Sequence, residues 1–144
     1  MSEGRHYWEI KIDKFVEMDD IIIGVSLKGM DMRSRPFDTG KFWGWICTGG
    51  RKIYPSAPGG PPQAREYGGN SKVGDTLGCL FEFKSNNMGS LTFLKNGTPL
   101  GACFSDIPPG SYNPCACLAY GEVQITLNPH ARLNSRPDSS KVYR

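Results

Sequence analysis

The dipeptide Asn96-Gly97 constrains the fold of this chain more than any other feature. It follows Leu91–Lys95 and precedes Leu100–Phe104, two runs rich in residues that favour strands. Asn-Gly between such runs is the strongest short-range signal for a β-hairpin, because a type I′ turn requires a positive φ at both central residues. A third run, Leu77–Phe83, precedes them across a polar connection. Together these runs predict an antiparallel meander.

Further short strand patterns, without a helical period, run through the rest of the chain. Tyr7–Asp13 alternates between apolar and polar residues, which predicts one face toward the core and one toward water. The expected core face is Trp8, Ile10 and Ile12, and the expected water face is Glu9, Lys11 and Asp13. Ile21–Leu27 is apolar at nearly every position, which predicts a strand covered on both faces. The other expected segments are strands at Phe42–Cys47, Pro114–Ala119 and Val123–Leu127, and a long loop from Thr48 to Gly69 with a short strand at Lys52–Tyr54.

These patterns amount to about ten short strands and no helix in a chain whose length is typical of one domain. The 18 glycines and 11 prolines supply the turns between them. Because so many short strands must bury apolar faces and limit exposed edges, we expect an all-β fold, a sandwich of two packed antiparallel sheets. The folded domain is expected over residues 1–128. Residues 129–144 are polar and patternless, so we expect a basic, flexible tail there.

The net charge of +3 is concentrated in this tail. Its charged residues are the basic Arg132, Arg136, Lys141 and Arg144 and the acidic Asp138. Residues 1–128 then carry 13 basic and 13 acidic side chains and are neutral as a whole. A nucleic-acid-binding domain carries its basic excess on the folded core, so we do not expect one here. Weak nucleic-acid association through the tail stays open as an alternative.

Cysteine usage and the absence of targeting signals indicate where the chain resides. The five cysteines, an odd number, are Cys47, Cys79, Cys103, Cys115 and Cys117. Cys79 and Cys103 lie among apolar neighbours, and Cys115 and Cys117 alternate within a strand-like run, which fits buried free thiols in a reducing compartment better than a disulfide framework. No apolar run approaches the roughly 20 residues needed to cross a bilayer, and the N-terminus lacks the apolar segment of a secretory signal. We therefore expect an intracellular protein, cytoplasmic or nuclear, without membrane association.

Catalytic and metal-binding constellations are weak in this sequence. The two histidines, His6 and His130, fall at the start of a strand and beyond the last one, so neither forms a clear pair with a nucleophile. Cys115 and Cys117 are a close pair without the second half that a zinc site needs. The glycine pairs lack the Gly-Lys-Ser/Thr of a phosphate-binding loop. We expect a protein that is not an enzyme and that holds no metal and no cofactor.

A series of motifs in register from Gly4 to about Asn128 resembles the SPRY domain (SPRY/B30.2 family). The motifs are GRHYWEIKI, IIIGVSL, FWGWICTGGRKIY, EYGGNSKVGDTLGCLFEF and GSLTFLKNGTPLGACFSDIPPGSYNPCACLAYGEVQITLN. The resemblance implies a bent β-sandwich with concanavalin-type topology that acts as a protein-recognition module. Because GRHYWE begins at residue 4, we expect no PRY segment before it.

The resemblance also implies which residues bind a partner, since SPRY domains read partners with loops gathered at one edge of the sandwich. The expected partner-binding residues are Arg33, Arg35 and Phe37 in one loop, Ala119, Tyr120 and Gly121 in a second, and Arg51 and Arg65 in the long loop. Tyr120-Gly121 matches the position where family members place an aromatic residue followed by glycine. Solvated loop charges remain the alternative for Arg33 and Arg35, and for Tyr54 and Tyr67 a core role is favoured.

The expected partner is a peptide or a protein surface, bound by a monomer. A substrate-recognition part of a ubiquitin ligase is the alternative role that the resemblance leaves open. No ligase-recruiting motif is present in these 144 residues, so we expect such a role to need further chain or a partner.

Overall fold

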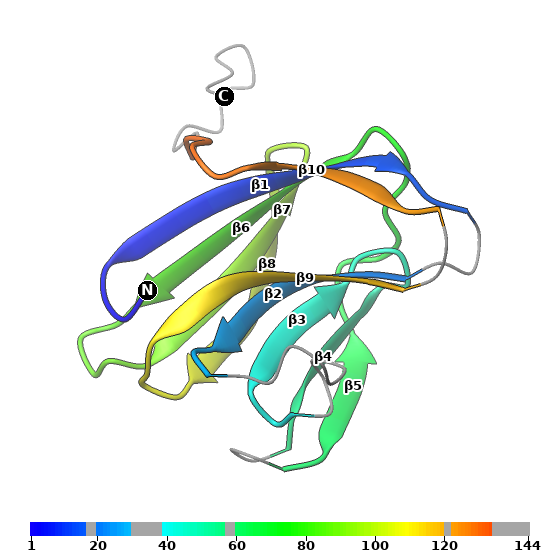
Figure 1. Ribbon diagram of the computed structural model, residues 1–144. Coiled ribbons are helices and arrows are strands. Elements are labelled where there is room, and N and C mark those ends of the chain that lie inside the picture. The colour runs from blue at the N-terminus through cyan, green and yellow to red at the C-terminus, as the bar shows by residue number, and fades with distance from the viewer. Residues whose placement is uncertain (17–19, 30–38, 57–59, 120–121, 134–144) are drawn as a thin grey trace.

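The computed structural model describes residues 1–16, 20–29, 39–56, 60–119 and 122–133, and it contains strands and turns throughout these ranges (Figure 1). The ten strands are β1 (Arg5–Lys14), β2 (Asp20–Leu27), β3 (Phe42–Ile46), β4 (Arg51–Pro55), β5 (Pro62–Glu66), β6 (Thr76–Phe83), β7 (Gly89–Lys95), β8 (Thr98–Ile107), β9 (Tyr112–Ala119) and β10 (Gln124–Asn128). The described part of the chain has no helix that could span a membrane.

The strands form two five-stranded antiparallel sheets that pack face to face (Figure 1). The first sheet has the order β10-β1-β6-β7-β8, and the second has the order β5-β4-β3-β2-β9. Most of the buried apolar side chains lie between them. This arrangement confirms the predicted all-β sandwich, and it confirms that Trp8, Ile10 and Ile12 face the core.

Aromatic rings from the two sheets pack against one another in the core. Tyr112 on β9 packs edge-on against Trp43 on β3, with ring centroids 5.8 Å apart, and against Phe81 on β6, with centroids 5.5 Å apart. Trp45 is fully buried and contacts Phe93 on β7. Rings in such geometry add to the stability that comes from buried area alone.

The predicted hairpin at Asn96-Gly97 is confirmed. Asn96 has φ of 51° and Gly97 has φ of 86°, as a type I′ turn requires. Lys95 pairs with Thr98 across the turn, which joins β7 to β8.

The strand predicted to be covered on both faces is β2, and it is buried as expected. Its residue Ile22 belongs to a second apolar cluster on the face of the sheet that points away from the main core. The buried members of this cluster are Ile22, Phe42, Ile53 and Cys115. Both faces of this sheet therefore bury apolar side chains.

Two predictions of the sequence are wrong. Glu9, expected to face water, is buried, with 5% of its surface exposed, and its carboxylate accepts a hydrogen bond of 2.7 Å from the hydroxyl of Tyr7. Glycine at position 78, opposite Glu9 on β6, leaves room for the Tyr7 ring beside it. The expected long loop from Thr48 to Gly69 contains a hairpin instead, formed by β4 and β5.

All five cysteines are free thiols, and four of them are buried. Burial raises the pKa of Cys47 and of Cys103 to about 12. These two thiols are therefore neutral at physiological pH and poor nucleophiles.

Candidate functional site

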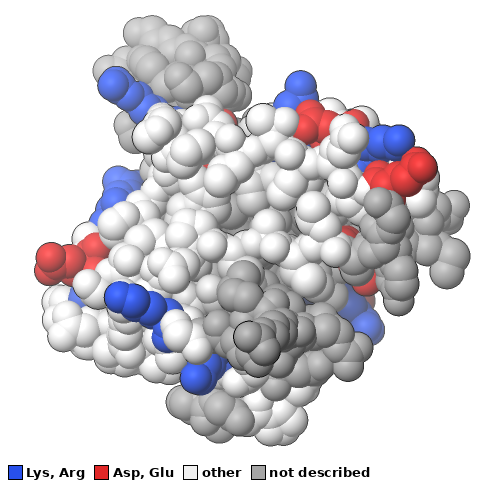
Figure 2. Space-filling view, viewed as in Figure 1, with Lys and Arg blue, Asp and Glu red and all other residues white. Residues whose placement is uncertain are grey.

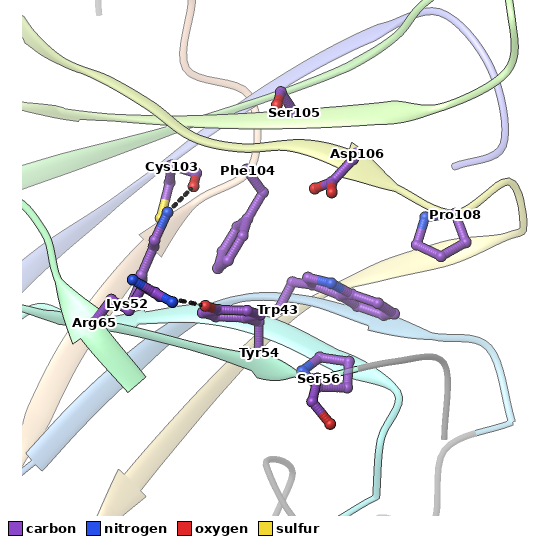
Figure 3. Close-up of a pocket in the computed structure, with 11 residues that line it drawn as sticks. Trp43, Lys52, Tyr54, Ser56, Arg65, Cys103, Phe104, Ser105, Asp106 and Pro108 are labelled. Atoms are coloured by element: carbon purple, nitrogen blue, oxygen red, sulfur yellow. Dashed lines mark hydrogen bonds between the residues drawn. The ribbon is translucent and has the colours of Figure 1, made fainter. Parts of the chain in front are cut away.

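A cavity of about 360 Å³ opens between the two sheets at the edge where β4 and β5 face β8 (Figure 3). β4 contributes Lys52 and Tyr54, and β5 contributes Arg65. Phe104 and Asp106 come from β8. The cavity thus combines aromatic walls with charged groups from both sheets, which is the mixture typical of ligand-binding sites.

The side chains of Lys52 and Arg65 enter this cavity together because their residues are directly opposite each other in the β4–β5 hairpin. The ammonium of Lys52 donates a hydrogen bond of 2.8 Å to the carbonyl oxygen of Cys103. It also lies 5.3 Å from the ring centroid of Phe104 and 5.8 Å from that of Tyr54. A cation at this distance from an aromatic ring is attracted by the ring quadrupole.

Arg65 is fixed by one hydrogen bond, in which its Nε donates to the hydroxyl oxygen of Tyr54 at 2.9 Å. The Tyr54 ring packs edge-on against Phe104, with centroids 5.6 Å apart. Figure 3 shows Asp106 on the other side of Phe104 from Lys52. The cationic and anionic ends of the cavity are therefore separated by an aromatic ring.

A second hollow, of about 450 Å³, lies at one end of the second sheet. It is lined by the turn that joins β3 to β4 and by the segment after β5, including Arg51, Glu66 and Tyr67. The Tyr67 hydroxyl donates to the carbonyl oxygen of Gly101 at 2.6 Å, while the Tyr67 carbonyl accepts a bond from the indole N–H of Trp45. Burial raises the pKa of Tyr67 well above its ordinary value. This tyrosine braces the scaffold, in agreement with the core role favoured for it.

The structure describes three of the eight residues expected to bind a partner. Arg51 is exposed at the start of β4, Arg65 is exposed on β5 at the mouth of the inter-sheet cavity, and Ala119 is the last residue of β9. The other five, Arg33, Arg35, Phe37, Tyr120 and Gly121, lie outside the described residues.

The register of the second sheet places the strand ends next to these loop residues at two opposite ends of the sheet. Ala119 pairs with Asp20, and Arg51 pairs with Ile46, so both lie toward one end of the sheet. Leu27, which precedes the segment containing Arg33 to Phe37, pairs with Tyr112 at the other end. An eight-residue strand places these ends about 20 Å apart.

The sequence reading missed the charged residues that line the inter-sheet cavity, Lys52 and Asp106. Lys52 alternates with Tyr54 in a short strand, and this spacing puts both side chains on one face. That signal was present in the sequence. No such signal marks the partner strand β5, because PQARE has no apolar alternation, and all five of its residues are exposed.

Charged side chains do not gather into one patch on the face drawn in Figure 2. Lys, Arg, Asp and Glu of the described residues appear there in separate small groups among uncharged residues. Among these residues, no three of His, Cys, Asp and Glu come together as a metal site would require.

Comparisons with known proteins agree on one family. A family model described as the SPRY domain matches residues 5–130. Ran-binding protein 9 of Danio rerio is 30% identical over 120 residues, which are 83% of this chain and 19% of that protein. F-box/SPRY domain-containing protein 1 of Anopheles gambiae is 21% identical over 131 residues, covering 88% of this chain and 49% of that protein. The chain thus spans about a fifth of the length of the Ran-binding relative.

Solved structures give the same answer for the fold. The crystal structure of the SPRY domain of human HERC1 matches with a TM-score of 0.70 at 18% sequence identity, covering 90% of this chain and 77% of that one. At this identity the likeness concerns the fold alone.

Proposed function

Because this chain belongs to the SPRY domain family, we propose that it recognises a short peptide segment or a surface patch of a partner protein through the loops at the ends of its second sheet. SPRY domains are generally protein–protein interaction modules. Rigid scaffolds carry binding residues on their loops, because loops can vary without disturbing the core.

One observation carries the proposal: Arg51 and the end of β9 at Ala119 share one end of a sheet that buries apolar side chains on both faces. Such a sheet holds its loop anchors in fixed positions. Tyr120 and Gly121 follow Ala119 directly, and the hollow beside Arg51 offers space for a side chain of the partner. Tyrosine and arginine are favoured interface anchors, since each offers a large contact area and a directional polar tip.

The test is to replace the proposed anchor and measure partner affinity. A partner is first isolated by capture on the immobilised domain, and its binding is then measured by calorimetry. Tyr120→Ala is expected to weaken binding by about 2 kcal/mol, as for a central interface anchor. The double variant Arg33→Ala/Arg35→Ala is expected to weaken it to a smaller degree, because solvated charges contribute little to binding.

The control is Lys11→Ala, an exposed residue of β1 on the first sheet, which is expected to leave affinity unchanged. Circular dichroism must show that each variant is folded. Unchanged affinity in a folded Tyr120→Ala variant would remove Tyr120 from the proposed binding surface.

We also propose that the protein acts inside the cell, on the ground of its five free thiols, and that it acts there as a monomer. Substrate recognition within a ubiquitin ligase is a second candidate, which the F-box in the name of the Anopheles gambiae relative favours. We further propose that residues 129–144 form a basic tail outside the binding domain. If this tail binds nucleic acid, binding to random oligonucleotides should fall steeply with salt and disappear when residues 129–144 are deleted.

A further inference from the structure

Two positive side chains face each other across the β4–β5 hairpin, and no acidic residue in the described ranges pairs with either of them. Lys52 and Arg65 are register partners, so their Cβ atoms lie on the same face of the hairpin. Like charges directly opposite each other destabilise a sheet. In the described part of the chain, the ion pairs join Arg5 to Glu82 and Lys14 to Glu122, and neither involves this pair.

Both cations keep hydrogen-bond donors that the described residues do not use. Lys52 spends one of its three N–H donors on the carbonyl of Cys103. Arg65 spends its Nε–H on Tyr54, so its four terminal N–H donors are available. The Tyr54 hydroxyl accepts that bond and can still donate its own proton. Donors from three side chains therefore converge at the mouth of one cavity.

The cavity gives this cluster of donors a defined shape. The rings of Tyr54 and Phe104 pack against each other beside the Lys52 ammonium, and the buried Trp43 lines the cavity next to Tyr54 (Figure 3). Asp106 lines the same cavity beyond Phe104 and has no ion-pair partner among the described residues. The charged lining is thus two cations near one end and one carboxylate at the other, which fits an anion at the first end and disfavours one at the second.

We propose that this inter-sheet cavity is a subsite for an acidic side chain of a partner protein. Its carboxylate would accept hydrogen bonds from Arg65, Lys52 and Tyr54, and its methylene groups would lie against the rings of Tyr54 and Phe104. Hydrogen bonds between charged groups are shorter and stronger than neutral ones, and the fork of the guanidinium matches a carboxylate in two places. Such an anion would also neutralise the repulsion between Lys52 and Arg65.

The identity of the bound group, an acidic side chain of a partner protein, rests on the proposed protein-binding function. The position of the subsite does not depend on that function. This subsite lies between the sheets at the β5–β8 edge, away from the end of β9 where Tyr120 follows Ala119. A peptide could therefore fail to bind here while a partner still binds at the loops, and the two proposals can fail separately.

The experiment titrates the full chain with short blocked peptides and follows binding by NMR. The probe is acetyl-Gly-Glu-Leu-Glu-Gly-amide, and its neutral match has glutamine in place of both glutamates. A phosphoserine version tests whether phosphate replaces carboxylate, and a ten-nucleotide single-stranded DNA tests nucleic acid. We expect the glutamate peptide to bind at least tenfold more tightly than the glutamine peptide, with shifts at Lys52, Tyr54, Arg65 and Phe104 and with affinity that falls as salt rises.

Matched variants locate the contact. Lys52→Met and Arg65→Gln are each expected to lower affinity for the glutamate peptide about tenfold. Lys84→Met is the control for the first, because Lys84 also donates to a carbonyl of β8, that of Ser105, but does not line the cavity. Arg5→Gln is the control for the second, as an exposed arginine of the other sheet. Arg65 is exposed on an edge strand, so its variant is expected to fold even if Lys52→Met does not.

Each outcome decides the proposal. Equal binding of glutamate and glutamine peptides, or no shift at the four cavity residues at millimolar peptide, would overturn it. Binding that survives both Lys52→Met and Arg65→Gln would place the anion elsewhere and also overturn it. If only the DNA binds through these residues, the subsite serves nucleic acid and the protein partner is wrong. If the phosphoserine peptide binds more tightly than the glutamate peptide, the anion site is supported and its occupant is a phosphorylated side chain.

Discussion

At the scale of single residues, Asn96 connects the hairpin turn to the rest of the first sheet. Its backbone has a positive φ, and its side-chain oxygen accepts a bond of 2.9 Å from the backbone N–H of Thr76. Its side-chain nitrogen donates to the carboxylate of Asp75 at 3.0 Å. The residue that sets the turn therefore also fixes the start of β6, which the turn signal alone does not reveal.

We predict that Asn96→Ala lowers the free energy of unfolding by about 2–3 kcal/mol, because it adds strain at positive φ and removes two hydrogen bonds. The control is Asn87→Ala at the other non-glycine position with positive φ in the described residues. Its side chain makes no such bonds there, so we expect a loss of only about 1 kcal/mol. Urea denaturation measures both values, and equal losses would show that the Asn96 side chain contributes nothing.

Asp75 gives the fold a pH-dependent contribution to stability. Burial alone raises the pKa of its carboxyl, but hydrogen bonds from Asn96 and from the backbone of Lys72, with the nearby charges of Lys95 and Lys72, outweigh it and lower the pKa below its usual 3.8. A group whose pKa is lower in the folded state stabilises the fold above its unfolded pKa, and this contribution is lost as the pH falls through the folded value.

We therefore predict that the difference in unfolding free energy between the wild type and Asp75→Asn is constant above pH 5 and shrinks below about pH 4. Urea denaturation from pH 3 to pH 7 measures this difference. A difference that stayed the same across the whole range would mean that Asp75 titrates alike in both states.

At the scale of elements, β2 and β3 pack through a pair of facing glycines. Gly24 pairs with Gly44 in the register of these strands. A methyl group added at Gly24 would overlap the carbonyl oxygen of Trp43 and come within 2.6 Å of the Cα of Gly44. These are backbone atoms and cannot rotate away. The close approach belongs to the pairing of the two strands, and neither strand shows it alone.

Gly24→Ala is accordingly predicted to lower stability by about 3 kcal/mol or more, since overpacking against backbone forces the strands apart. Gly49→Ala serves as the matched control, because a methyl group there would meet only the Ile46 side chain and backbone, at 3.1 Å or more. We expect a change below about 1 kcal/mol for the control. Thermal unfolding compares the two, and a mild effect at Gly24 would show that the sheet can adjust.

At the scale of the whole molecule, the burial of each thiol determines its pKa and its reactivity. Cys47, Cys79 and Cys103 lie in the core between the sheets, and burial raises the pKa of each. Cys117 is only half-buried, on the other face of the second sheet. Burial raises its pKa as well, but part of its surface is open to reagents.

A thiol reagent such as Ellman's reagent at pH 8 is predicted to modify Cys117 first. The three core thiols should react on the order of 100-fold more slowly, because they become accessible only when the structure opens. Mass spectrometry of digested protein, taken at successive times, assigns each site. Early modification of Cys79 would contradict the packed core.

The sequence by itself determined the strand-forming segments, the hairpin at Asn96-Gly97 and the family, because these depend on residues close together in the chain or on their order along it. Alternation correctly assigned Trp8 and Ile10 to the core, since the period of a strand is local. It failed at Glu9, which is buried between its neighbours on β6 and β10, and at β5, whose residues form a strand only because β4 offers its edge.

Only the tertiary structure decided which distant residues meet. Lys52 and Arg65 are 13 positions apart, yet the β4–β5 register puts them on one face, and the packing of the sheets adds Phe104 and Asp106 opposite. No local pattern encodes such a meeting, because it depends on strand pairing and on the contact between two sheets. The binding loops stay a prediction from the sequence, while the inter-sheet cavity lined by Lys52 and Arg65 comes from the fold.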